Sequence, residues 1–206
     1  MKVVNLLAGV DPEKCRGCRT CERVCPVLAI RMENKKAVVD PNRCRGCAAC
    51  EQRCPEHAIA MTKRSEPVVV KVEVPLAEYG RIEELCRKAR LHPEQVVCYC
   101  SGTRAEEVAA AIMQGARTPE DVSFMTGVRT GCKVECIQPV LRLLEAAGIK
   151  PEPPKGGWQW YGRTPTVWDI PAQVKQKYAS RGFYFDEDEQ LLDRVAAAPL
   201  QGKEEV

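Results

Sequence analysis

Short apolar runs separated by polar turn residues dominate the first part of the chain. Strands are predicted at residues 29–33 and 37–39, joined by the turn Asn34-Lys35-Lys36, and another strand begins at Ala58-Ile59. Residues 68–74 alternate apolar and charged side chains between two prolines, which predicts an edge strand or an extended linker. The N-terminal part is therefore expected to be built on short strands.

Beyond residue 76 the apolar positions follow a helical period. One helix is predicted over residues 77–89, where apolar side chains recur on one face. Thr103 stands three residues before Glu106, which is the spacing of a capping box ahead of a second helix. A third helix starts at Thr118-Pro119, and a fourth runs from about residue 134 to residue 148. Short helices at this spacing are typical of a small helical domain.

The C-terminal part has a different composition. Prolines and glycines after Lys150 predict a linker, and most aromatic residues of the chain follow it. They are Trp158, Trp160, Tyr161, Trp168, Tyr178, Phe183, Tyr184 and Phe185. No helical period is evident there, so we expect an extended arm. Its aromatic side chains either fold back over the protein or bury in a partner, and we favour the partner because Trp and Tyr are common interface anchors.

The whole pattern predicts the fold class α+β, with four parts in order. They are a strand-rich domain (1–66), a linker with one helix (67–94), a small all-α domain (95–149) and an extended, aromatic-rich docking tail (150–206).

Charge and hydropathy narrow the function classes. The net charge of 206 residues is only +3, so bulk electrostatic binding to nucleic acid is not expected. No segment approaches the roughly 20 apolar residues of a membrane span. The apolar run at the N-terminus ends at Asp11 without a cleavage site, so no secretion signal is expected. These features favour a reducing, cytoplasmic location.

The chain contains thirteen cysteines, and their spacing is the main indication of its function. Residues 12–32 and 41–61 repeat one pattern at an offset of 29, P-x-[KR]-C-R-G-C-x-x-C-E-x-x-C-P-x-x-A-I-x-M. Each copy holds the run C-x₂-C-x₂-C-x₃-C-P, which suits a [4Fe–4S] cluster. Zinc sites usually show separated C-x₂-C pairs, and a disulfide framework would not need two copies in one register.

Residues 1–64 resemble the bacterial two-cluster ferredoxins, which use this cysteine run. The resemblance implies a βαββαβ fold, two [4Fe–4S] clusters and one-electron chemistry, in an anaerobic or microaerobic setting. In that family the fourth cysteine of each run binds the other cluster. The implied cluster I set is Cys15, Cys18, Cys21 and Cys54, and the implied cluster II set is Cys44, Cys47, Cys50 and Cys25.

Two features of the ligand loops have more than one interpretation. Gly17 and Gly46 are expected where the backbone approaches the cluster closely. The loops also hold six arginines, Arg16, Arg19, Arg23, Arg43, Arg45 and Arg53. Their charge either stabilises the added electron and raises the reduction potential, or forms a solvated surface that docks an acidic partner.

A second group of cysteines lies in the helical region. Cys98-Tyr99-Cys100 precedes two helix signals, and Cys132 and Cys136 follow them. This context resembles the [2Fe–2S] domain named after bacterioferritin-associated ferredoxin (BFD), which combines C-x-C with a later C-x₂-C. The implied cluster III set is Cys98, Cys100, Cys132 and Cys136. Three residues separate the last pair instead of two, a rotation of about 100° on a helix, so [4Fe–4S] competes with the favoured [2Fe–2S].

The other candidate residues are expected to be structural. Cys86 shares a predicted helix face with apolar residues and is interpreted as a small buried hydrophobe. His57 and His92 have no partner motif and are interpreted as bystanders. Nucleotide-binding loops and catalytic triads are not recognisable, so no catalytic residue is assigned and no substrate chemistry is expected of this chain alone.

The motifs together predict an iron–sulfur electron-transfer subunit of an oxidoreductase complex. Resemblance to small subunits of redox enzymes suggests a tungsten-type (aldehyde oxidoreductase or class II benzoyl-CoA reductase), flavin-type or hydrogenase-type catalytic partner. A soluble ferredoxin or a flavin subunit would be the second partner. The alternatives are a free polyferredoxin carrier and an iron–sulfur redox sensor.

Overall fold

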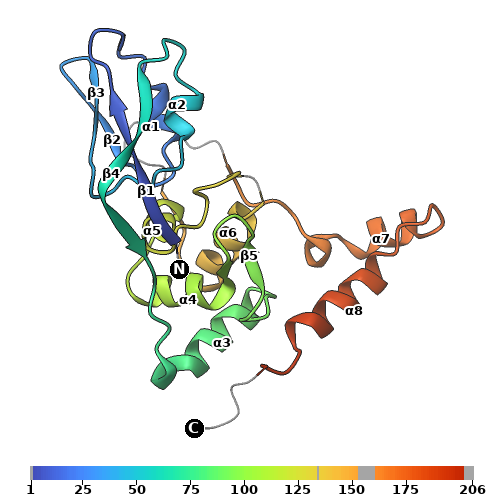
Figure 1. Cartoon of the computed structure of the whole chain (residues 1–206). Coiled ribbons are helices and arrows are strands. Elements are labelled where there is room, and N and C mark those ends of the chain that lie inside the picture. The colour runs from blue at the N-terminus through green and yellow to red at the C-terminus, as the bar shows by residue number, and fades with distance from the viewer. Residues whose placement is uncertain (1, 134, 153–160, 202–206) are drawn as a thin grey trace.

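A computed structural model describes residues 2–133, 135–152 and 161–201 (Figure 1). Its N-terminal domain has the element order β-α-β-β-α-β, which is the order that the sequence predicts. The elements are β1 (Lys2–Val10), α1 (Thr20–Val24), β2 (Ile30–Glu33), β3 (Lys36–Val39), α2 (Ala49–Gln52) and β4 (Ile59–Val70). Antiparallel pairing joins β1 to β4 and β2 to β3, so the strands form two separate two-stranded sheets.

The internal repeat is visible in the backbone. Three positions of each copy have positive φ angles, at the same offset of 29 that relates the two sequences. The matched pairs are Gly17 and Gly46 (74° and 61°), Arg19 and Ala48 (64° and 57°), and Leu28 and His57 (51° and 49°). Both short helices therefore begin after a left-handed residue, and both cysteine loops follow the same path into them.

The long pair β1–β4 reaches beyond the ligand loops. Val10 pairs with Ile59 at one end and Lys2 pairs with Val70 at the other, with a bulge between Val4 and Leu6. Of the edge strand or linker expected at 68–74, only residues 68–70 are strand; they form the last part of β4 and belong to the N-terminal domain. The Val10–Ile59 end lies next to the first cysteine loop, and the Lys2–Val70 end approaches the helical domain (Figure 1).

The helical domain packs around one apolar core. Its elements are η1 (Leu76–Glu78), α3 (Tyr79–Lys88), β5 (Val96–Cys98), β6 (Thr103–Arg104), α4 (Ala105–Met113), α5 (Pro119–Thr126) and α6 (Ile137–Ala146). The prediction of an all-α domain was wrong, because β5 and β6 form a small antiparallel hairpin. Helix α3 places Ile82 and Cys86, both 0% exposed, in the same core. It is part of this domain, and Cys86 is buried as a small hydrophobe would be.

The prediction of an extended C-terminal arm was also wrong for the described residues. This region contains η2 (Val167–Asp169), α7 (Ala172–Ala179) and α8 (Phe185–Ala196). Helices α7 and α8 extend away from the two domains (Figure 1). Among the helices that the structure describes, none is long and apolar enough to cross a membrane.

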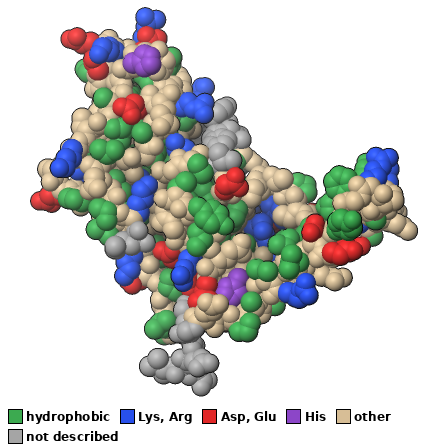
Figure 2. All heavy atoms as spheres, turned by 45° about the vertical axis from the view of Figure 1, so that its right-hand side comes forward, with side chains coloured by type: hydrophobic (Ala, Val, Ile, Leu, Met, Phe, Trp, Pro, Cys, Tyr) green, Lys and Arg blue, Asp and Glu red, His purple; other side chains and the backbone are tan. Residues whose placement is uncertain are grey.

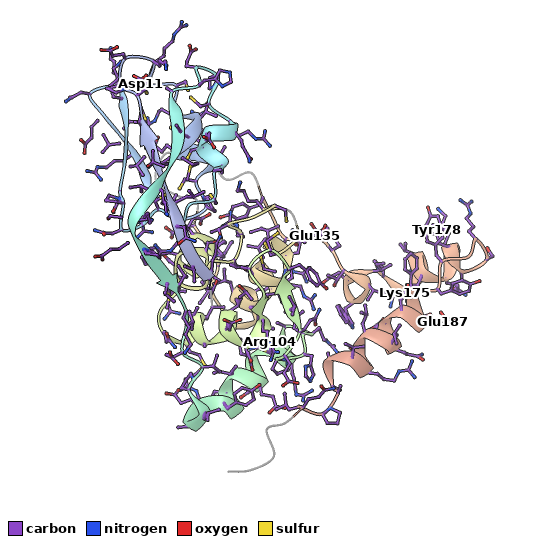
Figure 3. All side chains as sticks on the ribbon, viewed as in Figure 1. Asp11, Arg104, Glu135, Lys175, Tyr178 and Glu187 are labelled. Atoms are coloured by element: carbon purple, nitrogen blue, oxygen red, sulfur yellow. The ribbon has the colours of Figure 1, made fainter. Side chains whose placement is uncertain are left out.

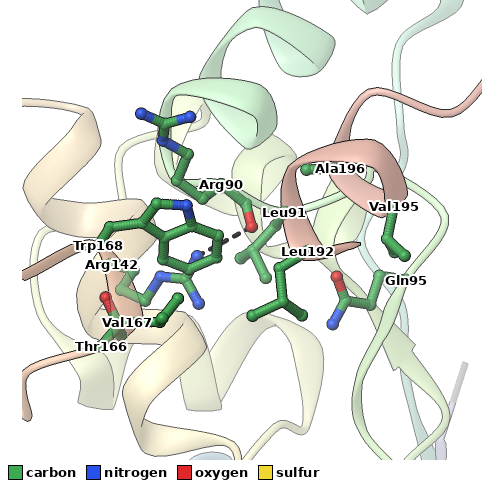
Figure 4. Close-up of a pocket in the computed structure, with 10 residues that line it drawn as sticks. All are labelled: Arg90, Leu91, Gln95, Arg142, Thr166, Val167, Trp168, Leu192, Val195 and Ala196. Carbon is green, nitrogen blue, oxygen red and sulfur yellow. Dashed lines mark hydrogen bonds between the residues drawn. The ribbon is translucent and has the colours of Figure 1, made fainter. Parts of the chain in front are cut away.

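The base of the arm is held on the helical domain around Trp168 (Figure 4). The Trp168 ring lies 5.1 Å from the Arg142 guanidinium, and its Nε1 donates to Asp193 Oδ1 at 3.0 Å. Arg87 Nη1 donates to the Ala196 carbonyl at 2.6 Å, and the His92 ring bonds the Ala198 carbonyl at 3.1 Å. Trp168 therefore folds back on the protein. Trp158 and Trp160 lie outside the described residues.

Candidate iron–sulfur sites

The four cysteines of the cluster I set line one cavity. Its walls include Cys15, Cys18, Cys21 and Cys54, with Met32, Ala37 and Ile59 behind them. The first three cysteines come from the first loop and helix α1, whereas Cys54 arrives from the second copy. A cavity with four thiol donors and an apolar back wall fits an iron–sulfur cluster, whose ligands are cysteine thiolates.

The cluster II cysteines also come together across the repeat. Cys25, from the first copy, lies close enough to Cys44 and Cys47 to interact with both electrostatically, and Cys50 interacts with all three. The structure thus juxtaposes the crossed set that the resemblance implies. Both groups contain one cysteine of the other copy, so the two halves of the repeat must fold together.

Backbone amides stabilise negative charge on the crossing cysteines. The N–H of Ala29 donates to Sγ of Cys25 at 3.2 Å, and the N–H of Ala58 donates to Sγ of Cys54 at 3.3 Å. These bonds are equivalent in the two copies. Hydrogen bonds to ligand sulfurs favour the thiolate and are among the factors that set the potential of a bound cluster.

Burial opposes ionisation at the inner cysteines. It raises the pKa of Cys21 to about 11 and that of Cys50 to about 12. In contrast, the Thr20 hydroxyl, 3.4 Å from Sγ of Cys18, lowers the pKa of that exposed thiol. Buried thiols bind as thiolates only when iron offsets the burial penalty, so loading of these sites releases protons.

The two loop glycines are required by contacts within the protein itself. A Cβ on Gly17 would lie 2.3 Å from the Lys35 carbonyl oxygen, and one on Gly46 would lie 2.7 Å from the Leu6 carbonyl oxygen. The close approach is to strand and turn backbone. Positive φ at both positions adds a second reason for glycine.

The cluster III cysteines form an inner and an outer pair. Cys98, at the end of β5, and Cys136, just before α6, are buried, whereas Cys100 and Cys132 are exposed. The Cys136 thiol donates to Cys98; this bond lowers the pKa of Cys98 to about 5 and raises that of Cys136. The N–H of Cys132 lies 3.4 Å from Sγ of Cys100. The two pairs are close to each other, because Cys132 interacts electrostatically with Cys136.

A buried ion pair lies beneath this site. The Arg129 side chain is 2% exposed, and its Nη1 donates to Glu120 Oε1 at 3.0 Å. The Tyr161 hydroxyl donates to the same oxygen at 2.7 Å, and its ring lies 4.9 Å from the guanidinium. Burial and the Glu120 charge raise the pKa of Tyr161. The backbone N–H of Arg129 donates to Cys98 and Cys136, so the ion pair and the ligands share one loop.

The loop arginines have different environments. Arg16 and Arg19 form surface ion pairs with Glu56 at 3.2 Å and Glu22 at 2.8 Å. Arg43 donates to the Val27 carbonyl at 3.1 and 2.9 Å. Arg45 is 7% exposed and contacts the helical domain, as described below. The loop arginines are therefore not one uniform charged patch.

Comparison with known proteins matches the two cysteine regions separately. The family model for a 4Fe-4S dicluster domain matches residues 8–73, and that for a BFD-like [2Fe-2S] binding domain matches residues 96–146. The chain is a fusion of two iron–sulfur domains. The dicluster domain implies two [4Fe–4S] clusters, and the BFD-like domain implies a [2Fe–2S] cluster, which confirms the preferred cofactor assignment. Searches of curated proteins and of solved structures found no match.

Three residues near these sites were missed by the sequence reasoning. Lys2 and Phe124 reach the ligand loops through tertiary packing, and Arg129 lies on the loop before Cys132. The signal at Lys2 was a single charge before an apolar strand, which by itself predicts only an exposed side chain.

Proposed function

We propose that this chain is the electron-transfer subunit of an oxidoreductase complex. In this proposal it passes single electrons through three iron–sulfur clusters between a soluble donor or acceptor and a catalytic subunit, in the cytoplasm, and carries out no substrate chemistry itself. The observation that carries the proposal is that three groups of four cysteines occupy two domains packed directly against each other. The bound clusters would supply the redox chemistry, and the chain holds them, orders them and sets their electrostatic surroundings.

The projecting helices α7 and α8 support a docking role for the arm. Phe183, Tyr184 and Leu191 are 51%, 63% and 51% exposed. Tyr178, Phe183 and Phe185 form an aromatic cluster, in which the Phe183 and Phe185 rings stack at 5.6 Å. Hydrophobic side chains gather on the lobe that carries these helices (Figure 2). Exposed aromatic groups with few contacts to their own chain are typical of an interface.

The catalytic partner is proposed to be a tungsten-, flavin- or hydrogenase-type subunit. The arm would bind this subunit, while the dicluster domain meets a soluble ferredoxin or flavin subunit. A free polyferredoxin carrier would not need such an arm. The exposed aromatic cluster therefore favours a permanent subunit.

Anaerobic iron and sulfide counting combined with EPR tests the cluster content. Two [4Fe–4S] clusters and one [2Fe–2S] cluster predict about ten iron atoms per chain, against about twelve for three [4Fe–4S] clusters. Cys100→Ser should remove only the BFD-like signal and about two iron atoms. Zinc in place of iron would overturn the proposal.

Substitutions on the arm test the docking role without disturbing the domains. Phe183→Ser combined with Leu191→Ser should leave the iron content unchanged and release the chain from the catalytic subunit during native purification. Leu76→Ser is the matched control, because Leu76 is 75% exposed and lies outside the arm. If the unaltered chain purifies alone as a monomer with all its iron, the free-carrier alternative replaces the subunit proposal.

A further inference from the structure

The first residues of β1 contact the loops of two different cysteine groups. On one side, the Gly46 loop packs against β1 so closely that a Cβ there would lie 3.0 Å from Val4 Cγ1. On the other side, Lys2 Nζ donates to the Thr130 carbonyl at 3.3 Å and to the Thr130 hydroxyl. Gly46 precedes Cys47 of the cluster II set. One strand therefore links the cluster II loop to the loop at Thr130.

Thr130 lies at the edge of the cluster III group. Its neighbour Gly131 is packed against Cys100, since a Cβ on Gly131 would be 2.4 Å from Cys100 Cβ. Cys132 follows, with its N–H 3.4 Å from Sγ of Cys100. The Lys2 ammonium is thus placed beside the outer cysteine pair.

Cluster I lies at the opposite end of the dicluster domain. The backbone N–H of Cys15 donates to the carbonyl oxygen of Asp11 at 3.1 Å, so Asp11 lies at the start of the cluster I loop. Figure 3 places Asp11 at the far tip of that domain, whereas Arg104 marks the helical domain. Among the cysteine groups of the dicluster domain, the one with Cys47 is therefore nearer to the BFD-like domain.

We propose that Lys2 is a shared positioning residue for the cluster II and cluster III sites, and that its positive charge raises the reduction potentials of both. The inference rests on the proposed function and deepens it, because it orders the sites as I, II, III along the molecule. A cation favours the more negative, reduced form of a neighbouring cluster, and a half-buried cation is screened less than an exposed one.

The contacts of the Lys2 side chain support this placement. Its ammonium donates to two oxygens of Thr130, two residues before Cys132. The strand that carries Lys2 packs against Gly46, the residue before Cys47. The side chain stem also runs close to Gly127, where an added Cβ would lie 3.2 Å from Lys2 Cδ.

An EPR-monitored redox titration of the fully loaded chain tests the proposal. Lys2→Gln should make the cluster II and cluster III sites about tenfold harder to reduce, which is about 59 mV for a one-electron couple. The cluster I potential should not change. Lys2→Arg should restore both potentials, because it keeps the charge. Lys63→Gln is the matched control, since Lys63 is an exposed residue of β4.

The possible outcomes separate the role of Lys2 from the proposed function of the chain. Unchanged potentials in Lys2→Gln, or an equal shift at all three sites, would overturn the shared role of Lys2. If Lys2→Gln loses iron, the reduction potentials of Lys2→Arg still test the proposal, because a purely structural role would not depend on the charge at this position. Failure of the unaltered chain to show reducible clusters would refute the proposed function instead.

Discussion

At the scale of single residues, the ion pair between Arg129 and Glu120 is the most constrained polar contact near the cluster III site. Glu120 is 5% exposed and Arg129 2%, and Arg129 also adopts a positive φ of 65°. Arg129 Nε is buried without a hydrogen-bond partner in the part of the chain that the structure describes. Such a pair is costly to break from one side, because the remaining charge stays buried.

A double-mutant cycle tests this pair. Glu120→Gln and Arg129→Met should each lower the free energy of unfolding by about 3–5 kcal/mol, and the double variant should lose less than their sum. Urea midpoints of the anaerobic, loaded protein measure the effect. Arg81→Met is the control, because the exposed Arg81–Glu78 pair at 2.7 Å is expected to contribute at most about 1 kcal/mol. If the single variants lower the free energy of unfolding as little as Arg81→Met does, the buried pair is well solvated.

Residue spacing predicted the cysteine groups but not their surroundings. A thiolate ligand set leaves a regular signature, and the structure places Cys25 and Cys54 beside cysteines of the other copy. The contacts of Lys2 and Arg45 depend instead on how the two domains dock. No local pattern encodes that docking.

At the scale of elements, the cluster I loop is fitted to the β2–β3 turn. Lys35, in that turn, has a φ of 61°, and its carbonyl oxygen occupies the space beside Gly17. The Lys36 ammonium also donates to the Cys15 carbonyl at 2.7 Å. The β2–β3 hairpin therefore contacts and positions the backbone of the loop that carries three of the four cluster I cysteines.

Alanine substitution separates this close packing from backbone strain. Gly17 and Gly148 have nearly the same φ, 74° and 73°, but only Gly17 has a neighbour within reach of a Cβ. Gly148→Ala should cost about 1 kcal/mol, which is the strain of a left-handed residue. Gly17→Ala should cost clearly more and should lower the occupancy of cluster I, measured by iron content and EPR. Equal effects of the two substitutions would show that the loop moves freely away from Lys35.

The sequence predicted most elements where a strong local signal exists. Thr118 caps α5 through its side chain and Pro119 begins it, as expected. The α4 helix begins after Arg104, one residue beyond the expected cap. Helix α8 was missed, although Asp186, Glu187 and Asp188 stand in its first turn and Arg194 in its last, which suits the helix dipole. Three of its apolar side chains are exposed, and the segment was interpreted as part of an extended tail, so its helical period was not recognised. The β5–β6 hairpin was too short to show an alternating pattern.

At the scale of the whole molecule, the two iron–sulfur domains are joined by a packed contact as well as by the chain. Phe124, from α5, packs on the core of the dicluster domain. The Arg45 guanidinium lies 4.1 Å from the centre of its ring and donates to its carbonyl oxygen at 3.1 Å. The Arg43 guanidinium lies 4.6 Å from the same ring. This contact, together with Lys2 and Thr130, keeps the cluster II loop beside the BFD-like domain. The rate of electron transfer falls steeply as the distance between two sites grows, so docking at Phe124 is expected to matter for function.

Phe124→Ala should loosen the docking while both domains remain folded. The substitution removes two cation–π contacts, of about 0.5–2 kcal/mol each, and part of the buried apolar area between the domains. Hydrogen exchange should then rise on both sides of the contact, at β1 residues near Lys2 and in the loop at Thr130. Met125→Ala is the matched control, because Met125 packs on the core of its own domain and its loss should affect that domain alone. Unchanged exchange at β1 in Phe124→Ala would show that the Lys2–Thr130 contact suffices for docking. If exchange rises and reduction of the BFD-like cluster by the dicluster domain slows in parallel, the fixed interface is what connects the two domains electronically.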